Sequence, residues 1–492
     1  MIRKFIRKLL GQSELPTSSH ATKQAAHKKQ PVNVPVRVHQ IDPALISRHA
    51  IRVTSTLQQA GYRAFIVGGA VRDLLLGFAP KDFDVATDAT PEQVQKLFRR
   101  ARLIGRRFQI VHVPFGQEII EVSTFRASLG AASVPPDPAS TDLPVRQGPR
   151  ARRNELDHRP HAIDASGRVL RDNIWGQQHE DAARRDFTIN AMYYDPTAQT
   201  VLDYHNGMAD IRARLLRIIG DPATRYREDP VRMLRIMRFA AKLGFEIEAT
   251  TRQPIRALAE LVRNVPSARL FDEMLKLLLC GQALTCLRQL RTEGLHHDLL
   301  PMLDTALAQP QSEKFITLAL DNTDERIRAG KFVSSSFLFA ALLWHEVHER
   351  WQKYIAANEY PIPALHHAMD ETLYVQMKKL AIQRRHIGDM KEIWGLQPRL
   401  EKRGHSAFKL LEHPRFRAAY DFLLLRCEAG ELDATVGQWW TAFIAADASQ
   451  RETLLSEGEH ERSSRRRRRG RAKPQASQNE DKLTLKTPTE SS

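Results

Sequence analysis

The chain has 492 residues, of which 42% are hydrophobic and 27% are charged, and this balance excludes disorder of the whole chain. Its length corresponds to about three domains of roughly 100–200 residues each. Lys and Arg outnumber Asp and Glu by 74 to 57, and the formal net charge of +17 indicates a polyanionic partner, either nucleic acid or an anionic membrane surface.

Residues 1–40 are expected to form a basic N-terminal arm and a polar linker. The first ten residues combine apolar and basic side chains at helical spacing. Two interpretations stay open: a frayed basic arm, which we favour, or a helix that lies on an anionic membrane surface. No apolar run reaches the ~18–20 residues that span a bilayer.

Residues 41–210 predict a small α/β head domain. Helices are expected from Ile41 to about Gln59, at 71–76 and from Pro91. Strands are expected at 62–67, 83–85, 109–113 and 118–124. Residues 127–168 contain six prolines without periodicity and predict a mobile loop inserted into this domain, with order resuming near Val169.

From about Ile211 the periodicity is helical, and it predicts a neck at 211–290 and a body with a C-terminal RNA-binding region at 291–450. Residues 451–492 predict a disordered tail, because a block of like charges repels itself. Its cations are Arg465, Arg466, Arg467, Arg468, Arg469, Arg471 and Lys473. The expected fold class is α+β, an α/β head followed by helical domains, with disordered basic ends.

The three cysteines indicate the compartment. Cys280, Cys286 and Cys427 have neither the spacing of a metal site nor that of a disulfide framework. We therefore expect a reducing, cytoplasmic location.

A glycine turn follows the strand at 62–67. Gly68 and Gly69 end this strand and begin a helix, where backbone N–H groups favour a phosphate, and Arg72 adds a cation nearby. An ordinary turn explains the two glycines equally well, so the turn alone does not decide between the two explanations.

Two carboxylates follow the glycine turn. Asp82 and Asp84 share a face if they lie on a strand, with Phe83 and Val85 pointing to the core. A solvated pair is the commoner explanation of this spacing, but the nearby glycine turn favours a divalent-cation site beside a phosphate site. Glu121, on a strand expected next to this one, is a third candidate ligand or an edge charge. Carboxylates that hold two Mg²⁺ ions would suit nucleotidyl transfer.

Three segments in order resemble the class II nucleotidyltransferases, which comprise bacterial poly(A) polymerases and CCA-adding enzymes. They are Gly68–Gly77 with the following Asp82-Phe83-Asp84, then Arg184–Ala191, then Glu228–Arg235. The resemblance covers roughly residues 50–430. It implies that Arg184, Arg185 and Asp186 handle the incoming ribonucleotide, where an ordinary ion cluster at a helix end is the alternative. Asp186 is predicted to be essential to catalysis, at the ribose or at the metal centre.

The helix after Asp229 can also be examined by itself. Asp229 is a suitable N-cap and Pro230 a suitable first residue, and Arg232 and Arg235 share a basic face next to an apolar stripe. Without the resemblance this face would be a solvated surface. With it, Asp229 and Arg232 are implied to select adenine, and Arg235 to bind the nucleotide beside them.

Two further segments are similar to the bacterial poly(A) polymerases rather than to the CCA-adding enzymes. They are Leu103–Val113, in which Arg106 and Arg107 are predicted to bind RNA, and Leu411–Asp421. The Arg-rich tail is also typical of these polymerases. Ala70 departs from the family, which commonly has another glycine there.

The resemblance therefore implies an enzyme that adds AMP from ATP to RNA 3′ ends without a template, and that promotes RNA processing and decay. The three carboxylates are expected to hold Mg²⁺ or Mn²⁺, and the glycine turn with Arg72 to hold the triphosphate of ATP. A monomer that meets RNA-decay proteins is expected. Two alternatives stay open: a CCA-adding enzyme that acts on transfer RNA, and a non-catalytic RNA-binding protein on the same scaffold.

Overall fold

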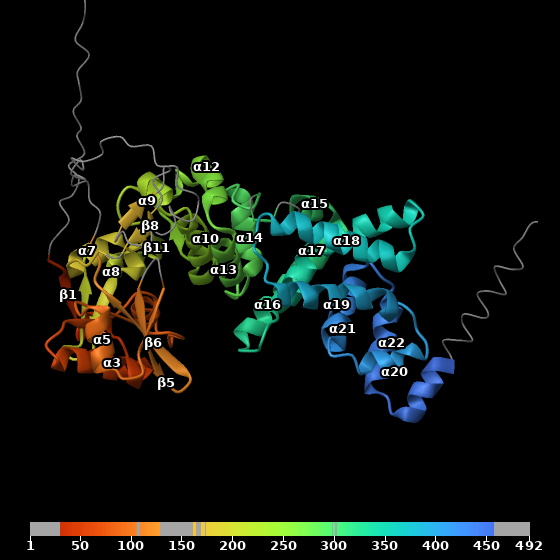
Figure 1. Cartoon of the computed structure of the whole chain (residues 1–492), viewed down its shortest axis with the longest axis horizontal. Helices are drawn as coiled ribbons and strands as arrows, with labels where there is room; N and C mark the ends of the chain where they lie inside the picture. The colour runs from red at the N-terminus through yellow and green to blue at the C-terminus, as the bar shows by residue number, and fades with distance from the viewer. Residues whose placement is uncertain are drawn as a thin grey trace, which may run out of the picture. The chain divides into compact units, whose positions relative to one another are not determined.

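The computed structural model describes residues 30–105, 109–127, 161–163, 169–172, 174–297, 299–300 and 303–456. The chain divides into two compact units (Figure 1). The head unit ends at Asp229 and also includes Glu246–Arg252, and the helical unit consists of Pro230–Phe245 and the chain from Gln253 onward. Among the described residues, no helix combines the length and the apolar character needed to cross a bilayer.

A mixed eight-stranded sheet forms the centre of the head unit, with the strand order β1-β10-β9-β2-β3-β6-β5-β4. Its strands are β1 (Val32–Pro35), β2 (Ala64–Val67), β3 (Asp84–Thr87), β4 (Arg102–Ile104), β5 (Ile110–Phe115), β6 (Glu118–Thr124), β9 (Met192–Asp195) and β10 (Thr200–Asp203). Strands β3 and β6 pair in parallel, and the other neighbours are antiparallel. Two small ribbons, β7 (His161–Ile163) with β8 (Val169–Asp172) and β11 (Leu215–Leu216) with β12 (Glu246–Ile247), complete its strands.

Short helices connect the strands of the head. They are α2 (Val36–His39), α3 (Arg48–Gln59), α4 (Gly69–Leu75), α5 (Pro91–Leu97), α7 (Gln178–Arg184), α8 (Gly207–Ala213), α9 (Pro222–Glu228) and α11 (Ala249–Arg252), with 3-10 turns at Pro43–Leu45 and Thr188–Asn190. Helix α3 is strongly amphipathic, and it begins where the Ser47 hydroxyl accepts hydrogen bonds from two backbone N–H groups. Helices α3 and α5 both pack against the sheet.

The helical unit contains the longer helices of the chain. They are α10 (Val231–Leu243), α12 (Ile255–Leu258), α13 (Ser267–Leu278), α14 (Ala283–Thr292), α15 (Leu303–Ala308), α16 (Pro310–Arg328), α17 (Ser335–Ala356), α18 (Pro361–Met377), α19 (Arg384–Leu400), α20 (Ser406–Leu411), α21 (Phe416–Ala429) and α22 (Ala434–Ala445), with a 3-10 turn at Ala259–Asn264. An aromatic cluster that includes Phe416, Trp439, Trp440 and Phe443 forms a core between α19 and α22. The expected α+β class, a mixed-sheet head followed by helices, is confirmed.

The predicted linker at 1–40 is wrong at its end. Residues 32–39 form β1 and α2, and β1 pairs with β10. Val34 is only 6% exposed and faces the core, whereas Val32 near the start of the strand is 49% exposed.

Three other predicted boundaries also differ from the structure. The head extends past residue 210, because Thr188 N donates to Arg217 O and Ile219 N donates to Asp186 O, which ties this segment to the head. Residues 161–163 of the predicted loop form β7, which pairs with β8. Residues 451–456 of the predicted tail are helical, and Leu455 is buried in the aromatic cluster.

Candidate active site

The glycine turn lies directly against two charged side chains. Gly68 has φ +73°, a left-handed conformation that favours glycine. A β-carbon placed on Gly68 would lie 3.5 Å from Arg185 Nη1 and 3.8 Å from Asp84 Oδ2. The turn therefore brings backbone, a guanidinium and a carboxylate together at the end of β2.

Asp84 is the first residue of β3, and Asp82 lies in the bend just before it. Phe83 and Val85 are buried while both aspartates are exposed, which is the alternation that the sequence predicts. Asp82 lies in a bend and not in the strand, so the alternation of buried and exposed residues continues two residues before β3 begins.

Glu121 is the direct neighbour of Asp84 in the sheet. The parallel pairing of β3 with β6 places the two residues opposite one another, as the predicted adjacency of these strands requires. On the other side of β6, His112 of β5 pairs with Glu121, and His112 Nε2 lies 3.3 Å from Glu121 Oε1. Asp84, Glu121 and His112 thus form a row across three strands, which we call the carboxylate row.

His112 was not among the predicted site residues, although the sequence contains the signal for it. Phe115 pairs with Glu118 on either side of a two-residue turn. Counting back three residues along each strand from that turn brings His112 opposite Glu121.

The carboxylate row carries excess negative charge. Burial of its carboxyl group and the charge of Glu121 raise the pKa of Asp84 to about 6; Arg185 opposes this rise, and Asp82 adds to it. Asp84 as a residue remains exposed to solvent. Carboxylates are preferred ligands of divalent cations. A cation bound at Asp84 would therefore offset the repulsion from Glu121 and Asp82.

Arg185, near the carboxylate row, belongs to a second cluster, in which the charges of Arg185 and Asp181 offset each other. Its Nε and Nη2 donate to Asp181 Oδ2 at 3.2 and 3.0 Å, and Tyr193 Oη donates to the same oxygen at 2.7 Å. Burial would raise the pKa of Asp181, but the charges of Arg185 and Arg184 and the bond from Tyr193 lower it overall. Arg184 Nη1 lies 3.9 Å from Asp181 Oδ1. We call Asp181, Arg185 and Tyr193 the arginine cluster.

Arg72 is buried, with its guanidinium bonded to protein groups. Its Nε and Nη2 contact Asp73 Oδ1 at 2.8 and 2.7 Å, and its Nη1 donates to Asn190 Oδ1 at 2.7 Å. Asn190 Nδ2 in turn donates to Asp186 Oδ1 at 3.2 Å, and this oxygen also accepts from Phe187 N at 2.8 Å. In this structure Arg72 contacts Asn190, which in turn holds Asp186, and the role of Arg72 in holding the triphosphate stays a prediction.

The predicted nucleotide-selecting residues lie at a junction between two helices. Asp229 is the C-cap of α9, and Pro230 occupies the N-cap position of α10, so the expected N-cap role of Asp229 is wrong by one residue. Arg232 and Arg235 are half-buried on one face of α10, and Arg235 Nη1 lies 4.0 Å from Glu273 Oε1. The predicted RNA-binding residues Arg106 and Arg107 and the tail cations from Arg465 to Lys473 lie outside the described residues.

Comparison with protein families matches three parts of the chain. Residues 64–217 match the poly A polymerase head domain, 244–307 match the "probable RNA and SrmB-binding site of polymerase A", and 357–474 match the "polymerase A arginine-rich C-terminus".

Individual relatives extend over most of the chain. The chain is 44% identical over 426 residues to a poly(A) polymerase I of Haemophilus influenzae, covering 85% of this chain and 89% of that protein. It is 43% identical over 478 residues to a poly(A) polymerase I of Escherichia coli O157:H7, covering 95% and 96%. A CCA-adding enzyme of Bacillus pumilus is 33% identical over 277 residues, or 56% of this chain and 61% of that enzyme.

Among solved structures, the CCA-adding enzyme of Bacillus stearothermophilus in complex with CTP is similar in fold. It has a TM-score of 0.50 and 21% sequence identity, and the match covers 85% of this chain and 92% of that chain.

Proposed function

The chain belongs to the poly(A) polymerase I family, and on this premise we propose that it adds AMP from ATP to RNA 3′ ends without a template and releases pyrophosphate. This membership confirms the resemblance that the sequence predicts. The CCA-adding alternative is less well supported, because the Bacillus pumilus relative is less similar and matches a smaller part of the chain. If the protein were a non-catalytic RNA-binding protein, the negative charges brought together in the carboxylate row would have no function.

The observation that carries the proposal is the register of Asp84 with Glu121, next to the Gly68 turn. Asp82, Asp84 and Glu121 would hold Mg²⁺ or Mn²⁺, because an all-oxygen set of carboxylates suits these cations. Besides burial, the charges of Glu121 and Asp82 raise the pKa of Asp84, and a cation would offset these charges. When bound, such a cation supplies charge stabilisation to the attacking and leaving oxygens.

The side chains of this protein orient the reactants. In the proposed reaction the RNA 3′ oxygen attacks the α-phosphorus of ATP, and the bond from that phosphorus to the oxygen bridging the α- and β-phosphates breaks. Gly68 and Gly69 allow phosphates to approach the backbone closely, and Arg184 and Arg185 offer positive charge nearby. Asp186, held by Asn190, would meet the ribose or support the metal centre.

Base selection is proposed for Asp229, Arg232 and Arg235. Side chains with fixed donors and acceptors reject a wrong base because their own groups then stay unpaired. We expect Arg232→Ala to lower the preference for ATP over CTP and GTP, measured as the ratio of kcat/KM values on one RNA primer. An unchanged ratio at a reduced rate would place selection elsewhere.

Further partners are proposed from the matched segments and from charge. Residues 244–307, the segment matched as an RNA and SrmB-binding site, would contact RNA or an SrmB protein. Arg106, Arg107 and the seven tail cations would neutralise RNA phosphates without sequence preference. A cytoplasmic monomer that promotes RNA decay fits these roles.

Incorporation of each ribonucleoside triphosphate on a short RNA tests the function. With Mg²⁺ present, we expect ATP alone to give a ladder of many added residues. Asp84→Asn should abolish the ladder, and Asp321→Asn, which changes an exposed aspartate of α16 outside the site, should leave it unchanged. With CTP and ATP supplied together, addition that stops after two C and one A residue would instead identify a CCA-adding enzyme.

A further inference from the structure

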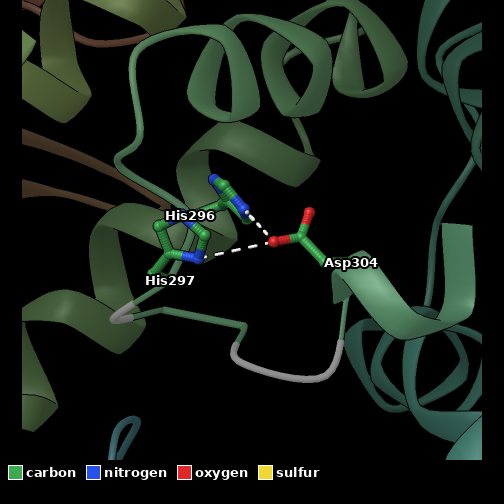
Figure 2. Close-up of side chains that lie close together, drawn as sticks. All are labelled: His296, His297 and Asp304. Carbon is green, nitrogen blue, oxygen red and sulfur yellow. Dashed lines mark hydrogen bonds and ion pairs between the residues drawn. The ribbon is translucent and has the colours of Figure 1, made fainter. Parts of the chain in front are cut away.

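A cluster of two histidines and one aspartate lies in the helical unit, apart from the residues assigned to nucleotidyl transfer. His296 and His297 follow α14, and Asp304 belongs to α15 (Figure 2). His296 Nε2 lies 2.6 Å and His297 Nδ1 lies 3.4 Å from the same oxygen, Asp304 Oδ2. One atom from each residue lies within 4.8 Å of the others.

The orientation of the Asp304 carboxylate leaves Oδ2 available to bind a cation. Arg291 Nε contacts the other oxygen, Asp304 Oδ1, at 3.2 Å, which fixes the orientation of the carboxylate. Oδ2 therefore faces the two imidazole rings.

The two histidines differ in burial. His296 is 4% exposed, and its Nδ1 is buried without a hydrogen-bond partner among the described residues. The side chain of His297 is 62% exposed, yet its ring lies against that of His296 with centroids 3.8 Å apart. The buried ring gives a fixed ligand, and the exposed ring leaves an entry path and room for a solvent ligand.

The chemistry of this set favours one kind of metal. Two imidazoles and one carboxylate are typical ligands of Zn²⁺, whereas Mg²⁺ and Ca²⁺ prefer oxygen ligands throughout. Ligand atoms around a tetrahedral zinc ion lie roughly 3.3–3.5 Å apart, given metal–ligand bonds of about 2.0–2.1 Å. The His297–Asp304 distance already matches this spacing, and the His296–Asp304 contact has to open by less than 1 Å.

We propose that His296, His297 and Asp304 bind one Zn²⁺ ion, with solvent at the fourth position. The ion would link the end of α14 to α15 within residues 244–307, the segment matched as an RNA and SrmB-binding site. It would stabilise the fold of that segment and would not replace the cation proposed for the carboxylate row.

The test uses the full-length, untagged protein after removal of metals with a chelator. Excess Mg²⁺ is added to occupy the carboxylate row, and Co²⁺ is then titrated while its visible absorption bands are recorded, followed by displacement with Zn²⁺. We expect one Co²⁺ per chain with the intense bands of tetrahedral coordination. His297→Ala is the main variant because this exposed side chain can be removed without opening the core. His366→Ala, at an exposed histidine of α18, is the matched control.

We expect His297→Ala and Asp304→Asn to weaken Co²⁺ and Zn²⁺ binding by about 100-fold or more, since each removes one of three ligands. His366→Ala should bind like the unaltered protein. Zn²⁺ should raise the midpoint of thermal unfolding of the unaltered protein and of His366→Ala, but not that of His297→Ala. If the unaltered protein gives no tetrahedral bands, or if His297→Ala binds equally well, the three side chains form only a hydrogen-bonded cluster and the proposal is overturned.

Discussion

The arginine cluster and the carboxylate row lie next to each other in the head unit, and their charges are balanced to different degrees. In the arginine cluster, Asp181 is buried, yet its pKa is lowered, because Arg185, Arg184 and Tyr193 compensate its charge. In the carboxylate row, Asp84 is the more exposed residue, yet its pKa is raised to about 6. The positive charge of Arg185 lowers the pKa of both Asp181 and Asp84, so this residue interacts with both groups.

This difference distinguishes groups that stabilise the fold from groups that would bind a cation. Where all partners of a buried charge come from the chain itself, the fold is complete without a ligand. Where like charges are brought into register and not neutralised, the folded protein keeps an electrostatic cost that an incoming cation removes. Substitutions in the carboxylate row should therefore change activity, and substitutions of Asp181 and Tyr193 should change stability.

The largest effect is expected for the carboxylate row. Asp84→Asn removes one charge from the proposed cation site while keeping the shape of the side chain, so extension of RNA with ATP and Mg²⁺ should fall by about 10³-fold or more. Single-turnover rates at saturating primer measure this loss. RNA affinity of the variant should be nearly unchanged, and an active Asp84→Asn enzyme would contradict the assignment.

The next effect is on stability. Asp181→Ala leaves the half-buried Arg185 without its main partner, so the free energy of unfolding should fall by about 3 kcal/mol. Tyr193→Phe removes one hydrogen bond to the same carboxylate and the one that Tyr193 Oη accepts from Arg185 Nε, and should cost about 1–2 kcal/mol. Urea unfolding of both variants checks the ranking. A loss below 1 kcal/mol in Asp181→Ala would show that the cluster does not support the fold.

A smaller effect on activity is expected at His112. His112→Ala removes the imidazole that contacts Glu121, so kcat should fall by about 10-fold and the Mg²⁺ requirement should rise, as for other residues that orient a metal ligand. His112→Gln, which can donate to Glu121, should restore part of the loss. The matched control is His49→Ala, because His49 pairs with Glu118 on the same strand outside the row. Equal effects of the two alanine variants would make His112 a structural residue only.

The smallest effect is a pH dependence of stability. The folded protein binds the Asp84 proton more tightly than the unfolded chain, because the pKa rises from 3.8 to about 6. The contribution of this group to the free energy of unfolding therefore falls as the pH rises from about 4 to above 6. Without divalent cations, Asp84→Asn should become more stable than the unaltered protein over this range, and added Mg²⁺ should reduce the difference. Thermal midpoints measured across pH 4–7 test the sign.

Local patterns in the sequence predict the carboxylate row well. The two-residue period of a β-strand predicts that Asp82 and Asp84 share a face. The expected pairing of two neighbouring strands adds Glu121. The hairpin turn would also have given His112. The first strand was assigned to the linker because its valines follow a long polar stretch, although their alternation indicates β structure.

The supporting contacts could not be predicted in this way. Arg72 stands next to the glycine turn in the sequence, which favoured a phosphate contact, but its partner Asn190 lies 118 residues away. Asp229 was expected to cap α10, yet α9 ends at this position and Pro230 takes the N-cap. The first result depends on which segments meet in three dimensions, and no local pattern in the sequence carries that information. The second is a shift of one residue at the end of a helix, where local patterns are least precise.

The pairing of β1 with β10 also bears on how the protein can be shortened. A chain that began at Ile41, where the helical pattern starts, would lose β1 and leave backbone groups of Thr200–Asp203 unpaired along one edge of the sheet. An open edge is a template for strands of other molecules. Such a shortened chain should therefore aggregate edge to edge more readily than one cut before Val32, which keeps as its edge the short strand β1 ending in Pro35, a residue that discourages strand pairing.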